Sequence, residues 1–193
     1  MFDFLKAHWV AGAALIAAAL LALAPILALD WPIGLWLIFL HSPGYMIHQV
    51  EEHARDRFRA FVNEEIFGGR EALTTGDVIA INVGAVWFGN LAALYAARFG
   101  GEGWGLAAPY LMLVNAVGHI GQAVVMRGYN PGVVTAALIF VPLGVTTLIV
   151  VPGAMAQHAV GLGIAVLTHL AIVAGVAWRL RTLGRAGAGE RPS

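Results

Sequence analysis

The sequence of residues 33–53 is IGLWLIFLHSPGYMIHQVEEH. The run begins as an apolar helix suited to lipid, and its last six residues include four ionisable side chains, His48, Glu51, Glu52 and His53. A helix advances by about 100° per residue, so Glu51 and Glu52, three and four positions after His48, can share a ligand or a proton with that imidazole. Ionisable groups at membrane depth are costly and mark functional sites, so this stretch predicts one.

The composition is that of a membrane protein. Of the 193 residues, 60% are hydrophobic and 11% are charged, and the mean hydropathy is +0.79. The formal net charge is zero, so the chain lacks the basic surface that nucleic acid requires, and we expect no such partner. Cysteine is absent, which excludes thiolate ligands and disulfides and leaves His and carboxylates as metal ligands.

Six apolar stretches have the ~20 residues that a helix needs to cross a bilayer. They are residues 10–29, 33–50, 78–97, 105–126, 132–151 and 158–178. We therefore predict an all-α polytopic bundle of six transmembrane helices, which forms a single domain over residues 1–183. Residues 51–77 are its cytoplasmic or interfacial connection, and residues 184–193, rich in Gly, Ala and Arg, are a disordered tail.

The basic residues predict the orientation of this bundle. With six spans, all of the 11 Lys and Arg residues except Arg98 fall on the side of the two termini. The positive-inside rule makes that side cytoplasmic. We expect a multi-pass protein of the bacterial inner membrane, in contact with membrane lipid.

Further polar side chains fall in or near the cytoplasmic half of the predicted spans. Asn115, His119 and Gln122 are spaced four and three residues apart and share one helix face. Other helices direct towards the same region His41, Tyr45, Asn82 and His169. For Asn82, Asn115 and His169 the simpler interpretation is a packing group that is hydrogen-bonded to a neighbouring helix. His119 is deep enough to need a partner, and the carboxylates after His48 lie at that depth.

These residues predict a metal site. Its candidate ligands are His48, Glu51, Glu52, His119, His53 and His41. Zinc and non-haem iron both suit His and carboxylate ligands, and both are open. Adjacent glutamates diverge by about 100°, so one binds the metal while the other accepts a proton or orients a histidine. Glu52 is favoured as the ligand, and Glu51 and His119 are the candidate catalytic groups. Tyr45, Asn82, Asn115, Gln122 and His169 are expected to line the polar cavity.

The residues His48, Glu51 and Glu52 in a small multi-pass protein resemble the HXXEE domain family, which is named for this signature. The later Asn115-x-x-x-His119 looks like an accompanying motif of that family. The resemblance covers most of the chain, from the second predicted helix to the last. It implies an integral membrane protein with an enzymatic role, and it implies no particular reaction.

The sequence favours a metal-dependent membrane enzyme. Zinc would support hydrolysis by an activated water, and iron would support an oxygen-dependent oxidation. A site that opens in the inner leaflet favours a hydrophobic, lipid-like substrate such as a fatty acyl or isoprenoid chain. Two alternatives are open: a proton-coupled small-molecule transporter, in which His48, the glutamates and His119 relay protons, and a non-enzymatic assembly subunit.

Overall fold

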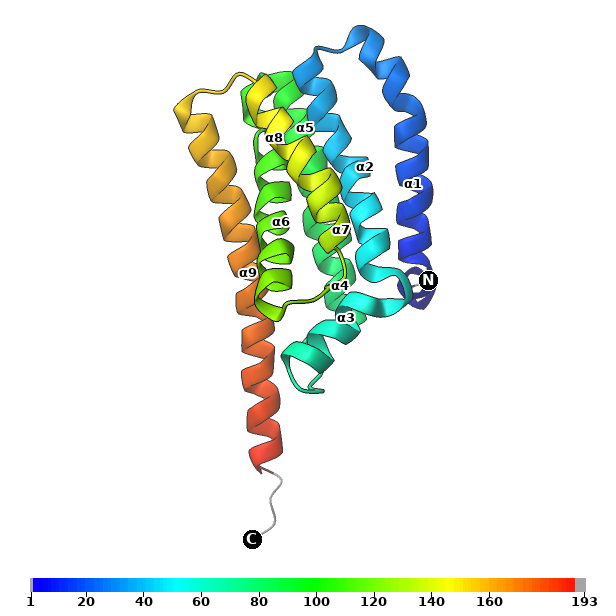
Figure 1. Ribbon diagram of the computed structural model, residues 1–193, viewed down its shortest axis with the longest axis vertical. Helices are drawn as coiled ribbons and strands as arrows, with labels where there is room; N and C mark the ends of the chain where they lie inside the picture. The colour runs from blue at the N-terminus through cyan, green and yellow to red at the C-terminus, as the bar shows by residue number, and fades with distance from the viewer. Residues whose placement is uncertain (1, 190–193) are drawn as a thin grey trace.

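The structure is a computed structural model that describes the backbone of residues 2–189 and the side chains of residues 3–183. All regular secondary structure in these residues is helical. Helical segments run alternately up and down, so the two ends of the described chain lie at the same end of the molecule (Figure 1). The segments are α1 (Phe2–Asp30), α2 (Ile33–His53), α4, η3 and α5 (Thr75–Ile79, Ala80–Trp87 and Phe88–Gly100), α6 (Ala107–Met126), α7, η5 and α8 (Val133–Thr135, Ala136–Phe140 and Val141–Val150), and α9 (Met155–Gly189).

Five helical stretches of the described chain are long and apolar enough to cross a membrane. They are residues 3–30, 75–100, 102–126, 133–150 and 155–183. The prediction of six such helices is therefore wrong by one, and the exception is α2. Polar residues such as His41, His48 and Gln49 lower the hydropathy of this 21-residue helix. Fourteen of its residues are buried, so much of α2 meets protein rather than lipid and need not be uniformly apolar.

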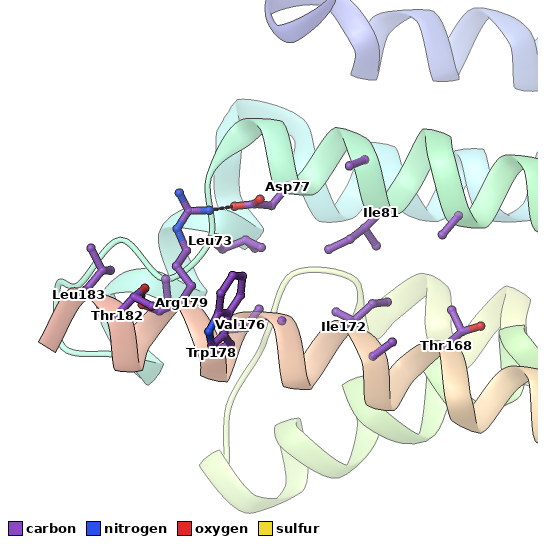
Figure 2. A pocket seen from close by; sticks show the side chains of 15 residues that line it. Leu73, Asp77, Ile81, Thr168, Ile172, Val176, Trp178, Arg179, Thr182 and Leu183 are labelled. Carbon is purple, nitrogen blue, oxygen red and sulfur yellow. Dashed lines mark hydrogen bonds and ion pairs between the residues drawn. The ribbon is translucent and has the colours of Figure 1, made fainter. Parts of the chain in front are cut away.

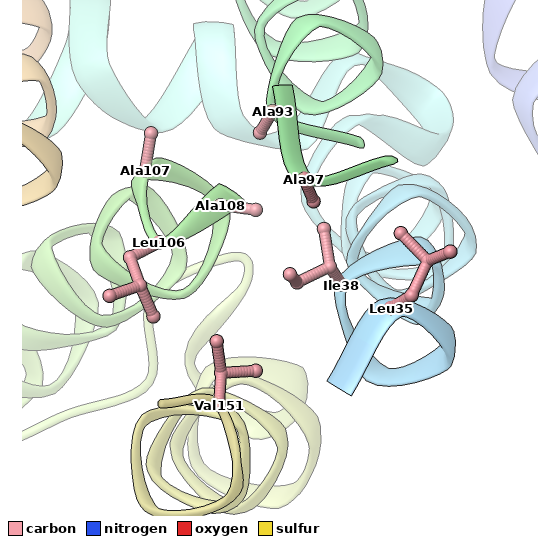
Figure 3. Close-up of a cluster of buried hydrophobic side chains, with 8 residues drawn as sticks. All are labelled: Leu35, Ile38, Ala93, Ala97, Leu106, Ala107, Ala108 and Val151. Carbon is pink, nitrogen blue, oxygen red and sulfur yellow. The ribbon is translucent and has the colours of Figure 1, made fainter. Parts of the chain in front are cut away.

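A cluster of buried apolar side chains fills the bundle at the end away from the termini. There, small residues let α2, α5 and α6 approach closely, since a Cβ added to Gly105 would lie 2.7 Å from Ile38 Cδ1 and 2.8 Å from Ala97 Cβ. The side chains of this apolar cluster are Leu35, Ile38, Ala93, Ala97, Leu106, Ala107, Ala108 and Val151 (Figure 3). The buried ionisable groups of α2 gather instead towards the end that carries the termini.

That end is covered by residues 54–74, here called the cap. Within it, η1 (Ala54–Asp56), α3 (Arg57–Phe61) and η2 (Val62–Ile66) fold back beneath the bundle (Figure 1). Asn63 fastens the following loop, because its Nδ2 donates to the Leu73 carbonyl and its Oδ1 accepts from the Leu73 amide, both at 2.9 Å. Arg59 pairs with Asp56 and Glu71, and its pKa is raised, chiefly by the hydrogen bond with Asp56.

The last helix is longer than expected. α9 continues to Gly189, so residues 184–189 of the predicted disordered tail are helical, and residues 190–193 lie outside the described residues. Both described ends lie at the same end of the bundle, in keeping with an even number of crossings (Figure 1). The side of the membrane on which they lie stays a prediction.

Candidate metal centre

α2 and α6 bring three buried side chains together near the cap. His48 Nε2 lies 3.6 Å from Glu52 Oε2, and His119 Nε2 lies 3.4 Å from Glu52 Oε1. One ligand atom from each residue can be chosen so that all three lie within 4.8 Å of one another. Their side chains are at most 8% exposed. His48 and Glu52 reach this point because residues four apart share a helix face, and His119 reaches it from α6.

Glu51 points into a different part of the molecule, the turn that begins α7. Its Oε1 accepts hydrogen bonds from the Tyr129 hydroxyl at 3.1 Å and from the amides of Gly132 and Val134 at 3.2 Å. Its Oε2 accepts from the amide of Thr135 at 2.7 Å and from the hydroxyl of the same residue. Burial and the nearby carboxylate raise the pKa of Tyr129, which keeps its hydroxyl protonated as a donor. Glu51 thus caps the start of α7 with both oxygens occupied.

The hydrogen bonds of Thr135 assign the tautomer of His48. The single hydroxyl hydrogen of Thr135 has two acceptors nearby, Glu51 Oε2 at 2.5 Å and the Gly132 carbonyl at 3.3 Å. Because that hydrogen goes to one of these oxygens, Thr135 Oγ1 accepts from His48 Nδ1 at 2.8 Å. His48 Nδ1 therefore carries a hydrogen. His48 Nε2 carries a lone pair in the neutral ring, and it has no hydrogen-bond partner among the described residues.

Asn130 assigns the tautomer of His119 in the same way. Its Nδ2 donates to the backbone carbonyl of His119 at 2.8 Å, which leaves its Oδ1 at 2.9 Å from His119 Nδ1. An amide oxygen only accepts hydrogen bonds, so His119 Nδ1 is the donor. His119 Nε2 then presents a lone pair to Glu52. The ring is covered by Phe58 of the cap, with 5.9 Å between the ring centroids.

A longer chain of hydrogen bonds reaches His53. The indole N–H of Trp87 donates to Gln49 Oε1 at 2.7 Å, and Gln49 Nε2 donates to Asn82 Oδ1 at 3.0 Å. Asn82 Nδ2 is consequently the donor that faces His53 Nε2 at 3.0 Å. The same His53 Nε2 lies 3.0 Å from Glu52 Oε2. His53 Nε2 can therefore accept from the Asn82 amide or donate to the Glu52 carboxylate.

Three imidazoles converge on one carboxylate in this cluster. The Nε2 atoms of His48, His53 and His119 surround the two oxygens of Glu52. In the neutral tautomers assigned above, the Nε2 atoms of His48 and His119 are acceptors. Acceptors held at such distances in a low-dielectric interior repel one another unless a proton or a metal ion lies between them. Metal–ligand bonds of ~2.1 Å place tetrahedral ligands ~3.4 Å apart, close to the observed 3.4 and 3.6 Å. The donor set suits a transition-metal ion, and the Nδ1 hydrogen bonds to Thr135 and Asn130 are of the kind that hold metal-binding histidines in place.

A cavity of about 440 Å³ lies beside the cluster, between α2, the cap, α4, η3, α6 and α9. Its polar end is formed by His48, Glu52, His53 and His119. Most of its walls are apolar and include Phe58, Val62, Phe67, Leu73, Val78, Ile81, Val86, Leu111, Ile172, Val173, Val176 and Leu180. A mostly apolar cavity with a few convergent polar groups is the usual form of a small-molecule site.

The structure gathers some of the other predicted residues and leaves others apart. Tyr45, Asn82, Asn115 and His169 are among the residues that line this cavity, whereas Gln122 is not. Asn115 Oδ1 has no hydrogen-bond partner among the described residues, and His169 Nδ1 donates to the carbonyl of its own helix. His41 is fully buried and bonds the Leu37 carbonyl, but it is not part of the three-residue group. His53 lies at the edge of that group, beside Glu52, and Glu51 lies outside it, on the turn before α7.

Three residues of the centre were not foreseen from the sequence: Thr135, Asn130 and Gly132. Gly132 has a φ of +103°, and a Cβ there would lie 2.8 Å from His48 Cε1 and 2.7 Å from His119 Cε1. The run Asn130-Pro131-Gly132 is a recognisable turn signal in front of an apolar span. Nothing in that signal shows that the turn packs against two histidines from other helices.

Comparison with known proteins gives one match. The model of a family described as "Protein of unknown function with HXXEE motif" matches residues 36–147, which is more than half of the chain. The matched range contains the group of His48, Glu52 and His119, and it also contains the residues that contact this group: His53, Phe58, Asn130, Gly132 and Thr135. No curated protein and no solved structure matches the chain.

Proposed function

This chain belongs to the HXXEE family, and we propose that it is a metal-dependent membrane enzyme. In this proposal one ion is held by His48, Glu52 and His119, and a hydrophobic, lipid-like substrate occupies the adjoining cavity. The observation that carries the proposal is the convergence of the Nε2 atoms of His48 and His119 on one buried carboxylate. Protonation of one ring would satisfy one of these two contacts, whereas a metal ion satisfies both at once.

Three protein ligands leave coordination positions open for water, oxygen or substrate. Two histidines and one carboxylate are the ligands of hydrolytic zinc sites and of non-haem iron oxygenases alike. A zinc ion would activate a water for hydrolysis, and an iron ion would support oxygen-dependent oxidation. The identity of the bound metal therefore selects the reaction class.

The two glutamates take separate roles in this proposal. Glu52 is the ligand, and Glu51 orients His48 through the Thr135 hydroxyl instead of accepting a proton itself. His53 lines the cavity with its Nε2 beside Glu52, and in this proposal it would accept a proton from the reacting water.

One observation favours a second function, proton-coupled transport. Hydrogen bonds run from the buried His48 through Thr135 to Glu51, and the Tyr129 hydroxyl continues them towards the exposed surface. Such a chain could carry protons to and from the cluster. A carrier of this kind would fold and work without a metal ion.

Metal analysis of the detergent-purified protein tests the proposal. We expect close to one zinc or iron per chain, and a lower melting temperature once a chelator removes it. Glu52→Gln, which keeps the shape of the side chain, should lose most of the metal, whereas Glu51→Gln should retain more. His158→Ala is the matched control, because His158 bonds Tyr110 and is not a member of the three-residue group. A folded, active and metal-free wild type would reject the enzyme proposal in favour of the carrier.

A further inference from the structure

A second, larger cavity of about 780 Å³ lies on the outer side of the same helices (Figure 2). It is a groove between α4 and η3 on one side and α9 on the other. Figure 2 shows Leu73 and Ile81 on one wall and Ile172 and Val176 on the other. Along its length α9 packs mainly against α6 and makes few contacts with α4 and η3.

The groove and the cavity of the metal centre share a wall. Leu73, Ile81, Thr168, Ile172 and Val176 line both. These five residues form the boundary between the two spaces, and rotation of side chains such as Ile172 is fast compared with motion of whole helices. The groove lies where a molecule dissolved in the bilayer would reach the centre sideways.

An ion pair crosses the groove at the end nearest the termini (Figure 2). Arg179 Nη1 donates to Asp77 Oδ2, and these side chains are 38% and 40% exposed. Among the described residues, Asp77 is the one hydrogen-bond partner of the Arg179 side chain, whereas Asp77 also caps α4 through Thr74. An ion pair so exposed contributes ~1 kcal/mol or less, so an incoming anion can take the place of Asp77 at little cost.

The walls of the groove suit one hydrocarbon chain. From Thr168 to Leu183, α9 rises by ~22 Å, which exceeds the ~15 Å of hydrocarbon in one leaflet. Trp178 lies at the charged end, as an aromatic residue at a membrane interface would. The inner cavity of about 440 Å³ is smaller than the groove, and this favours a molecule with one chain over a two-chain lipid.

We infer that the groove binds a fatty carboxylate, with its head on Arg179 and its chain directed towards Thr168, and that it is the lateral entrance to the metal centre. The binding stands on the groove alone, whereas its role as a substrate entrance rests on the proposed function. A guanidinium and a carboxylate form paired, charge-assisted hydrogen bonds, which gives the head group its specificity.

Photo-crosslinking with a diazirine-labelled palmitate tests the inference on the detergent-purified protein. Cross-links should map to residues 72–85 and 168–183, and unlabelled palmitate should compete for them better than hexadecanol, which lacks the charge. Arg179→Gln should weaken competition by palmitate about tenfold or more and leave competition by hexadecanol unchanged. Arg181→Gln is the matched control, because Arg181 lies on the same helix but lines neither cavity.

Asp77→Asn separates a binding role from a structural one. This variant keeps an acceptor for the Thr74 cap and removes the competing charge, so palmitate should bind at least as tightly as to the wild type. Equal binding of acid and alcohol, equal behaviour of the two Arg variants, or a loss of palmitate binding in Asp77→Asn would each overturn the inference. Wild-type protein treated with a chelator should still bind palmitate in the groove, so a protein without metal can fail the proposed function and still show the groove site.

Discussion

Gly132→Ala should disturb the proposed metal centre without changing any of its candidate ligands. The added Cβ would lie 2.7 Å from His119 Cε1 and 2.8 Å from His48 Cε1, and ordinary van der Waals contact begins at 3.4 Å. The rings would have to withdraw by the difference, 0.7 and 0.6 Å. A functional site needs its ligands within ~0.5 Å of their working positions, so the expected loss of metal affinity is tenfold or more.

The backbone adds a second cost to the same substitution. Gly132 has a φ of +103°, a conformation that residues with a Cβ rarely adopt, and this strain costs ~1–3 kcal/mol. We expect Gly132→Ala to melt at a lower temperature than the wild type, and by a larger margin with metal than with chelator. The measurements are the metal dissociation constant and the melting temperature under both conditions.

Gly118→Ala is the control for this prediction. Gly118 directly precedes His119 on α6, has a helical φ and has no atom within 4 Å of an added Cβ. Its substitution should leave metal affinity unchanged and stabilise the helix by ~0.5–1 kcal/mol. Gly132→Ala with the metal affinity of the wild type would refute the reasoning, since it would mean that neither ring is held in place by this contact.

Three other predictions concern the surroundings of the site and the topology. Thr135→Val removes the hydroxyl that links Glu51 to His48 and should weaken metal binding 10- to 100-fold, as measured by metal titration. Thr147→Val is the control, because the Thr147 hydroxyl bonds the Leu143 carbonyl of its own helix, and it should leave metal binding unchanged. Asn63→Ala removes both hydrogen bonds to Leu73, lowers the local stability of the cap by ~1–3 kcal/mol and should speed hydrogen exchange over residues 63–74. Unchanged exchange there would show that these two hydrogen bonds do not hold the loop. Reporters fused at residue 66 and after the last residue should both report cytoplasm, and opposite locations would reject the predicted orientation.

Local rules were enough to predict much of this protein. Apolar runs of bilayer length predicted the alternating helices, and the spacing of four between His48 and Glu52 placed both on one side of α2. The divergence of adjacent helical residues correctly separated Glu51 from Glu52. The predicted count of membrane-length apolar helices was one too many because it included α2. This helix carries the polar groups of the candidate site, which lower its hydropathy, and it is largely buried by protein.

The centre itself needed the tertiary structure. Thr135 lies 87 residues from His48 in the chain, and Gly132 fits between two histidine rings only because the turn before α7 folds against α2 and α6. No periodicity relates residues on different helices, so sequence spacing could not place these contacts. The sequence alone determined that this protein is a helical bundle with apolar helices long enough to cross a membrane and with His and Glu at one end. Which histidines face Glu52, and with which nitrogen, was decided by packing between helices, because only packing sets the hydrogen-bond partners that fix each ring.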